Sequence, residues 1–372
     1  VPRRVSDEPR TDVVGKWVQC NPESVANFSA VAYFFGRELR SELNIPVGLI
    51  HTSWGGTPAE AWTRNAALAA DPVLKPILGR WEKIVADWPQ ALKEHQVQLE
   101  AWKKQAAAAR AAGKRPPRRP RGPIGPNNPH RPSSLFNGMI APLVPFAIRG
   151  VIWYQGESNA SRAEQYRTLF PTMIRDWRQA WGHDPFPFLF VQLANFKAIQ
   201  PGPVESAWAE LRDAQRLALN EPKTAMAVAI DIGEARNIHP KNKQEVGRRL
   251  ALAAQALCYE GKFVYSGPLY RTHFAAGSEI ALEFDHVGGG LKTRNDDPLT
   301  GFSIAGPNKK FYRAHARIEG HKVVLSHPRV THPSAARYAW ADNPICNLIN
   351  AEGLPASPFR TDDWPGVTAG QR

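Results

Sequence analysis

The chain has 372 residues, of which 43% are hydrophobic and 10% aromatic. This apolar content is enough for one large core, or for one large and one smaller core, and excludes an intrinsically disordered protein. No apolar run approaches the roughly 20 residues of a membrane-spanning helix, so we expect no membrane partner. Residues 71–121 hold 12 Lys or Arg and 5 Asp or Glu, and therefore 7 of the 13 net positive charges. The remainder is only mildly basic, so we expect no nucleic-acid partner.

Three cysteines, Cys20, Cys258 and Cys346, lie far apart in the chain and lack CxxC spacing. This pattern argues against a zinc site and against a dense disulfide framework. We therefore expect buried free thiols, with a single disulfide bridge as the alternative. The sequence indicates no metal and no cofactor.

The first regular elements are expected near the N-terminus. Residues 27–43 place apolar side chains at helical spacing, and Asn27 is a suitable cap, so we predict an amphipathic helix. The apolar run at residues 45–50 predicts a buried strand. Residues 51–57 then form a glycine-bearing turn at the carboxyl end of that strand.

A detour at residues 66–134 separates this strand from the next one. Its first part, residues 71–112, is rich in Ala, Lys, Glu and Gln and predicts a helical hairpin. Its second part, residues 113–132, is rich in Arg, Pro and Gly and cannot be helical. We interpret the detour as a solvated surface insertion; the alternative is a basic arm that binds an anionic polymer.

The next part of the chain alternates strands with helices. Strand-like runs at residues 149–154, 186–193 and 224–230 are followed by helical patterns at residues 162–180, 205–220 and 242–259. This alternation predicts a parallel sheet that is covered on both faces. Ligands of such sheets bind beyond the carboxyl ends of the strands.

After residue 262 the pattern changes to short alternating runs separated by glycine-rich turns. Residues 280–284, 315–318 and 322–326 are examples, and Gly320 stands at the turn of a predicted hairpin. We therefore expect an α/β domain at residues 1–261 and a smaller all-β module at residues 262–372.

Polar residues follow the expected strands, where a ligand of a parallel sheet would bind. Gly55 and Gly56 let backbone N–H groups approach a ligand closely, although glycines after a strand more often only form a tight turn. Gln155, Glu157 and Asn159 directly follow an apolar strand. Such a polar cluster predicts a substrate site, in which the Asn159 amide would stabilise an oxyanion, a contribution of about 10² to 10³ in rate.

A third polar segment, residues 231–240, follows the last strand of the expected sheet. His239 stands there between Ile238 and Pro240, on a turn that precedes a helix. This position suits a general base that deprotonates a serine. A lone histidine is more often structural, but the two other polar segments favour the catalytic interpretation.

Four motifs, SWGGTPAEAW, SSLFNGMIAPL, IRGVIWYQGESNA and DIGEARNIHPKNK, in this order closely resemble the sialate O-acetylesterase family of SGNH-type hydrolases. The resemblance continues through GFSIAG, RYAWADNPICNLIN and GLPASPFRTD in the β-rich part. It implies an α/β fold, a three-layer sandwich around a parallel sheet of the SGNH or flavodoxin-like type. It also implies Ser–His hydrolysis of O-acetyl esters of sugars without a metal, and an extracellular or periplasmic location.

The resemblance assigns roles to individual residues. Gly55 or Gly56 matches the oxyanion glycine of the family, Asn159 matches the oxyanion asparagine, and His239 matches the general base. The implied partner is an O-acetylated carbohydrate. No oligomeric state is implied.

One departure from the family concerns the nucleophile. The family carries it in a Gly-Gln-Ser-Asn motif after the first strand, and no residue before position 45 matches that motif. We therefore expect a hydrolase domain that lacks its first strand, from a longer natural protein, and that is inactive as it stands. Ser158 imitates the motif and is the alternative nucleophile, followed by Ser53.

A second departure concerns the acid that orients the base. SGNH enzymes commonly carry Asp three residues before the histidine, and Arg236 stands at that position here. Asp231, Glu234 and Glu157 are the candidates for this role, and a backbone carbonyl is a further alternative.

Other functions stay open at this point. Acetylated xylan or pectin is an alternative substrate to O-acetylated sialic acid. A non-catalytic carbohydrate-binding protein that has lost its serine is an alternative from a different class. Nucleic-acid binding through residues 115–121 is a third, and it predicts a steep dependence of binding on salt.

Overall fold

The computed structural model describes residues 1–182 and 185–372. Its α-helices are α1 (Pro22–Val25), α2 (Ala30–Leu43), α3 (Asn65–Ala70), α4 (Lys75–Ala111), α5 (Ala163–Trp181), α6 (Ala207–Leu217) and α7 (Lys243–Cys258). Short 3-10 or π-helical turns are η1 (Ala59–Trp62), η2 (Phe136–Ile140), η3 (Ala141–Leu143), η4 (Glu157–Arg162), η5 (Ala218–Asn220) and η6 (Arg294–Asp296). The strands are β1 (Val151–Trp153), β2 (Phe188–Gln192), β3 (Thr224–Val228), β4 (Leu269–Ala276), β5 (Glu279–Asp285), β6 (Leu291–Thr293), β7 (Phe302–Ala305), β8 (Phe311–Arg313), β9 (His315–Glu319), β10 (Lys322–Ser326), β11 (Ala335–Tyr338), β12 (Leu348–Asn350) and β13 (Phe359–Arg360).

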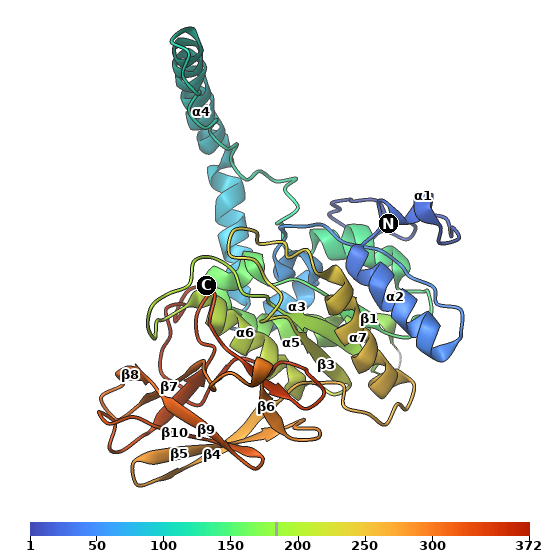
Figure 1. Cartoon of the computed structure of the whole chain (residues 1–372). Coiled ribbons are helices and arrows are strands. Elements are labelled where there is room, and N and C mark those ends of the chain that lie inside the picture. Colours follow the sequence, from blue (N-terminus) through green and yellow to red (C-terminus); the bar gives the residue numbers. More distant parts are fainter. Residues whose placement is uncertain (183–184) are drawn as a thin grey trace.

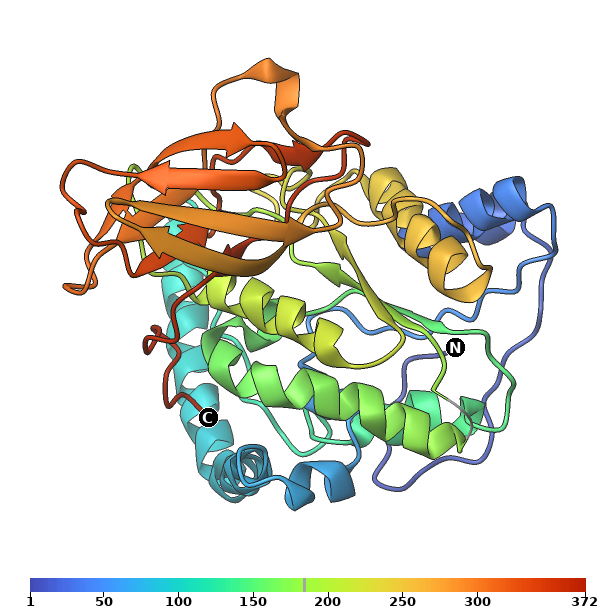
Figure 2. The same ribbon diagram turned by 90° about the horizontal axis from the view of Figure 1, so that it is seen from below.

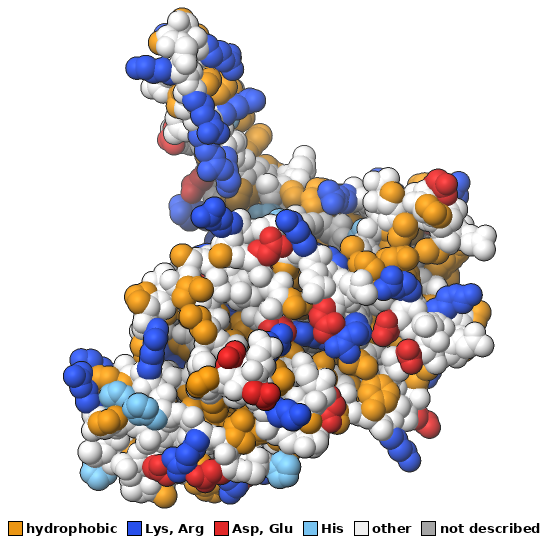
Figure 3. Space-filling model, in the orientation of Figure 1, with side chains coloured by type: hydrophobic (Ala, Val, Ile, Leu, Met, Phe, Trp, Pro, Cys, Tyr) orange, Lys and Arg blue, Asp and Glu red, His pale blue; other side chains and the backbone are white. Residues whose placement is uncertain are grey.

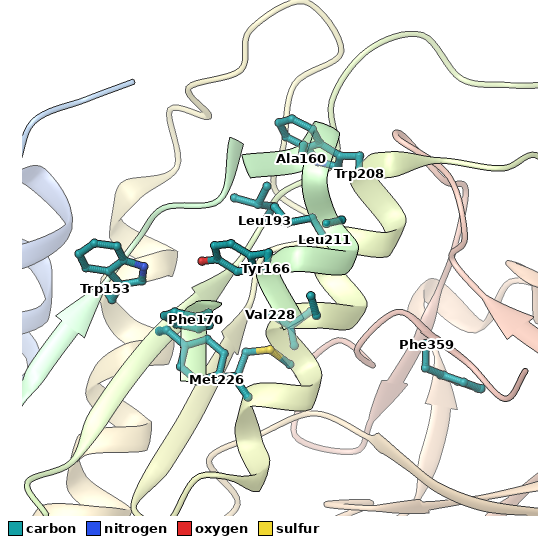
Figure 4. Close-up of a cluster of buried hydrophobic side chains, with 14 of the residues drawn as sticks. Trp153, Ala160, Tyr166, Phe170, Leu193, Trp208, Leu211, Met226, Val228 and Phe359 are labelled. Carbon is teal, nitrogen blue, oxygen red and sulfur yellow. The ribbon is translucent and has the colours of Figure 1, made fainter. Parts of the chain in front are cut away.

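A parallel sheet in the order β1-β2-β3 lies between two layers of helices (Figures 1 and 2). The alternation of side chains along β2 explains the two layers, because successive residues of a strand point to opposite faces. Phe188 and Phe190 enter the hydrophobic cluster that includes α5 and α6, whereas Leu189 and Val191 enter the cluster that includes α2 and α7. Figure 4 shows part of the first cluster. The predicted three-layer α/β sandwich is confirmed.

The predicted strand at residues 45–50 is not formed, and its side chains are exposed or half-buried instead of buried. In the part of the chain that the structure describes, β1 pairs with β2 alone. A strand needs a neighbour for its N–H and C=O groups, and without one this apolar run stays irregular. Val47 nevertheless packs on the same hydrophobic cluster as Ile152 of β1. The helix before it is α2, which is capped by the Ser29 hydroxyl and not by Asn27.

Residues 71–112 of the insertion contain one long helix, α4, and not the predicted helical hairpin. Helix α4 has 37 residues and continues through Pro89, and it projects from the body of the molecule (Figure 1). The Arg/Pro-rich residues 113–132 return along it, as expected without helical structure. The Trp102 indole donates to the carbonyl of Pro117 at 2.8 Å, and the Arg119 guanidinium lies over the Trp102 ring. Lys and Arg side chains line the visible face of this arm (Figure 3).

The C-terminal module is all-β, as predicted. Its larger sheets have the orders β4-β5-β10-β9 and β13-β11-β7-β8, and Gly320, at φ +59°, forms the predicted turn between β9 and β10. One buried side chain, Arg212 of α6, connects the module to the α/β body. It donates to the carbonyls of Leu193 and Ala194 in the body and to those of Ala341 and Asp342 in the module, at 2.7 to 2.9 Å.

No helix of residues 1–182 and 185–372 combines the length and the apolarity that a membrane span requires. The three cysteines are free thiols, so the alternative of a disulfide is not met. Cys258 and Cys346 are half-buried, whereas Cys20 is exposed, contrary to expectation. Cys20 lies in an N-terminal stretch in which most side chains are exposed.

Candidate active site

The turn after β1 is tied to the loop that carries Gly55 and Gly56. The Asn159 side-chain oxygen accepts from the backbone N–H of Ala59 at 2.9 Å and from the Gln155 amide at 2.7 Å. Gln155 also donates to the carbonyl of Thr57 at 3.2 Å. These bonds hold the glycine loop and the β1 turn together, so the structure joins two of the polar segments that the sequence singled out.

Asn159 is nearly fully buried, with 2% of its surface exposed. Its amide nitrogen donates to the Glu60 carboxylate at 2.8 Å. Glu60 is itself buried and also accepts from Arg80 and Arg162. The Asn159 amide is therefore fixed in one orientation by partners on both sides. Fixed N–H dipoles of this kind stabilise a developing oxyanion without reorganising during the reaction.

The glycine loop presents its backbone to solvent. Gly55 and Gly56 are exposed, and a Cβ atom built on either of them would meet no neighbouring atom within 4 Å. Gly56 has φ +79°, a conformation that favours glycine. The open backbone leaves room for a ligand beside this loop.

The His239 turn lies close to the β1 turn. Burial raises the pKa of Glu157, and the charges of His239 and Lys243 act in the opposite direction. The Lys243 ammonium also lies 5.1 Å from the centre of the Tyr154 ring. Glu157 and Asn159 share the η4 turn, so the structure brings His239 to the same edge of the sheet as Asn159.

The turn that holds His239 is positioned by the end of β2. The Asn195 side chain accepts from the backbone N–H of Gly233 at 2.7 Å and donates to Asn343 of the C-terminal module at 2.8 Å. A Cβ atom on Gly233 would lie only 2.0 Å from the carbonyl oxygen of Asn195. Gly233 is therefore required for this close approach. The His239 side chain itself is exposed.

The predicted orienting acids have different surroundings. Asp231 accepts from Arg249 at 2.7 and 2.9 Å and from Arg294 at 2.6 Å. Burial alone would raise the pKa of Asp231, but these two guanidinium groups hold it below its usual value. Glu234 accepts from the backbone N–H of Lys241. Over residues 1–182 and 185–372, no carboxylate makes a hydrogen bond with the His239 ring, so Glu157 is the candidate whose charge is coupled to it.

The two alternative nucleophiles lie at the edges of the same region. The exposed Ser53 hydroxyl is 2.7 Å from Nε2 of His51. Burial, followed by the positive charges of the Val1 amine and Arg3, lowers the pKa of His51. Ser158 lies on η4 between Glu157 and Asn159 and borders a cavity beneath helix α4.

Sequence reasoning missed the residues that support the site. Glu60 gave no signal because it is a single carboxylate within an alanine-rich stretch, and only the fold shows that it is buried beside Asn159. Tyr166 of α5 was also missed; its hydroxyl donates to the Gln155 side-chain oxygen at 3.0 Å. Asn195 was missed as well, although it is a polar residue that follows a strand, β2, as Asn159 follows β1.

The assembled groups are the His239 imidazole, the Asn159 amide with its fixed orientation, the open glycine backbone and the half-buried Glu157 carboxyl. These are the parts that acyl transfer to and from a serine requires, apart from the nucleophile itself. Among the residues that the structure describes, no group of three or more His, Cys, Asp or Glu is arranged to hold a metal ion.

Comparison with known proteins gives consistent matches. Residues 130–256 match the family described as "Carbohydrate esterase, sialic acid-specific acetylesterase". The chain is 35% identical to the sialate O-acetylesterase of Rattus norvegicus over 65% of its own length and 45% of that protein. It is 30% identical to the human sialate O-acetylesterase over 91% of its own length and 62% of that protein. The chain thus spans about half the length of the curated relatives it matches.

A solved structure extends the likeness to the fold. The crystal structure of a carbohydrate acetylesterase from Xanthomonas citri is 38% identical and superposes with a TM-score of 0.80, over 98% of this chain and 72% of that one. At this identity and coverage the likeness reaches beyond the sheet to the insertion and the β module. The chain therefore belongs to the sialate O-acetylesterase family of carbohydrate esterases.

Proposed function

We propose that the chain carries the oxyanion-binding and general-base groups of a carbohydrate O-acetylesterase, which releases acetate from O-acetylated sugars by a Ser–His mechanism. One observation carries the proposal: the buried Asn159 amide, the open Gly55–Gly56 backbone and the His239 turn lie at one edge of the parallel sheet. The names of the relatives, sialate O-acetylesterase and carbohydrate acetylesterase, support the same reaction.

In the proposed reaction His239 accepts the proton of a serine hydroxyl while the serine oxygen attacks the acetyl carbonyl carbon. The carbonyl oxygen becomes an oxyanion, which the Asn159 amide and a backbone N–H of Gly55 or Gly56 stabilise. The sugar oxygen leaves and takes the proton from His239. His239 next takes a proton from water, whose oxygen attacks the carbonyl carbon of the acetyl-serine. The bond to the serine oxygen breaks, this oxygen regains the proton from His239, and acetate is released.

We place the nucleophilic serine on a strand between residues 45–50 and β1. Val47 and Ile152 of β1 belong to one hydrophobic cluster, and β2 is the neighbour of β1 within residues 1–182 and 185–372. A strand inserted here would satisfy both unpaired backbones, and its carboxyl end would point toward the site. Such a strand would come from outside the 372 residues, as the longer relatives allow.

We assign to Glu157 the role of the acid that interacts with His239. The charges of His239 and Lys243 lower the pKa of the Glu157 carboxyl against the effect of burial, whereas Asp231 forms ion pairs with two guanidinium groups. A carboxylate beside the imidazole stabilises the imidazolium that forms when the serine proton is taken. Asp231 then has a structural role, because its ion pair with Arg294 attaches η6 of the β module to the sheet.

The experiment uses the natural protein with any sequence that precedes Val1. A panel of O-acetylated sialosides, acetylated xylo-oligosaccharides and acetylated pectin fragments is assayed for acetate release. Turnover of at least one class at enzymatic rates supports the proposal, and the preferred class identifies the substrate. Binding of these glycans without acetate release would contradict it and support the carbohydrate-binding alternative. An extracellular or periplasmic location, where such glycans are met, belongs to the same proposal.

The 372-residue chain alone tests the position of the nucleophile. We expect it to release no acetate, because it contains no serine in the required strand context. Acetate release by this chain that Ser53→Ala abolishes would move the nucleophile to the Ser53–His51 pair, whose side chains lie 2.7 Å apart. Release that Ser158→Ala abolishes would move it to η4.

A further inference from the structure

The charge of the insertion is concentrated in its outer part. Residues 75–102, the part of α4 nearer the body, hold four Lys or Arg and four Asp or Glu. Residues 103–121, which we call the cationic end, hold eight Lys or Arg and no acidic residue. Solvation of a helix requires only that charges of both signs are interspersed, as they are in the nearer part. Solvation therefore does not explain the single sign of charge in the cationic end.

The eight cationic side chains of this segment are all exposed. They are Lys103, Lys104, Arg110, Lys114, Arg115, Arg118, Arg119 and Arg121. Within residues 1–182 and 185–372, the pair of Lys103 with Glu100, at 2.6 Å, is the one ion pair that any of them forms. Like charges at this density repel one another unless an anion neutralises them. The cationic end therefore presents a positive potential to a partner that approaches the arm (Figure 3).

The returning leg of the insertion packs on α4, so the cationic end is an ordered structure and not a loose tail. The Trp102 ring lies beneath the Arg119 guanidinium, and its N–H donates to the carbonyl of Pro117 at 2.8 Å. Nearer the body, the leg comes so close to Trp88 that a Cβ atom on Gly125 would lie 2.6 Å from the indole nitrogen. Glycine is thus required at that point of the leg.

Helix α4 carries the cationic end away from the body. Ile77, near the start of α4, is buried in the hydrophobic core. A helix rises about 1.5 Å per residue, so Lys103 lies about 40 Å further along it. The outer part of the arm stands clear of the other elements (Figure 1). A flat surface can therefore touch the cationic end without meeting the body.

The composition of the cationic end favours lipid phosphate groups over a polymer. Sugar rings and nucleic-acid bases stack on open aromatic faces, but residues 103–121 contain no aromatic residue, and the neighbouring Trp102 is half-buried beneath Arg119. The segment also contains no Val, Leu, Ile or Met that could enter a hydrocarbon layer. Charge is left as the means of binding, and a cluster of about four to eight Lys or Arg residues suffices to hold a segment at an anionic bilayer.

We propose that the cationic end binds the surface of a bilayer that is rich in anionic phospholipids, and that α4 holds the α/β body away from this surface. The contact crosses no bilayer, so it agrees with the lack of a spanning helix among the described residues. The expectation of no membrane partner rested on spanning segments, and the proposal limits it to these. The inference is independent of the proposed function, because no residue of the candidate active site takes part.

Vesicle binding by the 372-residue chain tests the proposal. The vesicles contain phosphatidylglycerol and phosphatidylcholine in equal parts, or phosphatidylcholine alone, and co-sedimentation gives the partition coefficient. We expect at least about 100-fold stronger binding to the anionic vesicles, and its loss at high ionic strength, because salt screens exposed charges. Equal binding to both kinds of vesicle would overturn the proposal. Tighter binding of a DNA duplex or of polygalacturonate than of the anionic vesicles, per anionic group, would also overturn it.

A charge variant assigns the binding to the cationic end. The combined substitutions Lys104→Gln, Lys114→Gln and Arg118→Gln remove three exposed charges. Each Lys or Arg near an anionic bilayer strengthens binding by about five-fold, so this variant should bind about 100-fold more weakly than the parent. Unchanged binding would refute the proposal.

The matched control removes one Arg and two Lys from other parts of the surface. It combines Arg40→Gln, Lys262→Gln and Lys292→Gln, which are also exposed positions. Its net charge equals that of the first variant, and it should bind the anionic vesicles as the parent does. Equal weakening in both variants would show that the overall charge of the protein drives binding, and would refute the cationic end as the site.

The orientation of the bound protein is tested without any charge variant, and decides if the first variant does not fold. A donor dye is attached to the exposed Cys20 of the body, or to Ala107→Cys in a chain that also carries Cys20→Ser. Energy transfer to acceptor-labelled anionic vesicles should be stronger from position 107, which lies in the cationic end, than from position 20. Equal transfer from both positions would contradict a contact through the cationic end.

Discussion

The turn after β1 and the turn that holds His239 differ in how firmly the fold fixes them. Asn159 is buried and has hydrogen-bond partners from Ala59, Gln155 and Glu60. The His239 ring is exposed and has no hydrogen-bond partner among the residues that the structure describes. The two proposed catalytic residues therefore contribute differently to the stability of the fold. A change at Asn159 should affect both folding and catalysis, whereas a change at His239 should affect catalysis alone.

We expect the largest effect from a change at the exposed residue, His239. In the natural protein, His239→Ala should lower acetyl-ester turnover by at least about 10³-fold, as loss of the base does in Ser–His enzymes. Its Tm should change little, because the side chain is exposed. Acetate release and thermal unfolding measure the two quantities. Retention of most of the activity would remove His239 from the mechanism.

Asn159→Ala tests the buried side. We expect turnover to fall by about 10² to 10³, the value of one oxyanion donor. We also expect a loss of about 1 to 3 kcal/mol in unfolding free energy, because Glu60 loses a buried donor and Gln155 a buried acceptor. Urea unfolding gives the second quantity. Unchanged stability would contradict the buried network, and unchanged turnover would contradict the oxyanion role.

Asp231→Asn tests a residue on the His239 segment that is fixed as firmly as Asn159. Removing one partner of a buried ion pair costs about 3 to 5 kcal/mol, and Arg249 would lose its partner. Because the pKa of Asp231 is held below its usual value, the ion pairs stabilise the fold above pH 3.8, and this stability is lost as the pH falls through the lowered pKa. The stability difference between parent and variant should therefore vanish in strong acid. A shift in the pH profile of kcat without a loss of stability would instead make Asp231 the partner of His239.

Glu157→Gln has the smallest expected effect on stability. Unlike the two preceding substitutions, it should stabilise the fold. Burial raises the pKa of Glu157, so the ionised carboxylate weakens folding at neutral pH, and this cost disappears as the pH falls below the ordinary value of 4.5. The Gln variant should melt at a higher temperature at pH 7 and at the same temperature as the parent below pH 4.5. In the natural protein its turnover should fall, because the imidazolium loses a nearby negative charge. Glu42→Gln, at an exposed position of α2, is the control.

The sequence predicted the elements that have a clear apolar pattern. The three strands of the parallel sheet formed at the predicted apolar runs, and helices α2, α5, α6 and α7 formed where apolar residues recur with the period of a helix. The apolar run at residues 45–50 has the composition of a strand, but a strand also needs a neighbour, which composition does not show. The hairpin prediction was wrong because α4 continues through Pro89, where proline removes one backbone hydrogen bond without ending the helix.

The candidate site was predictable only in part for a related reason. Polar residues that follow strands are visible in the sequence, so Asn159 and His239 could be predicted as site residues. In the structure their turns lie at the same edge of the sheet. The environment of a carboxylate is a property of the fold. Nothing in the sequence distinguishes Asp231, which lies in an ion-pair network, from Glu157, which is half-buried and has a raised pKa.

Arg212 makes the α/β body and the β module mutually dependent. Its guanidinium is fully buried, and half of its carbonyl partners come from each part. Truncation near residue 261 would remove the carbonyls of Ala341 and Asp342 from Arg212 and expose its guanidinium to water. The two parts should accordingly unfold in one cooperative step. Evolution in this family is then expected to exchange body and module as a unit and not as separable pieces.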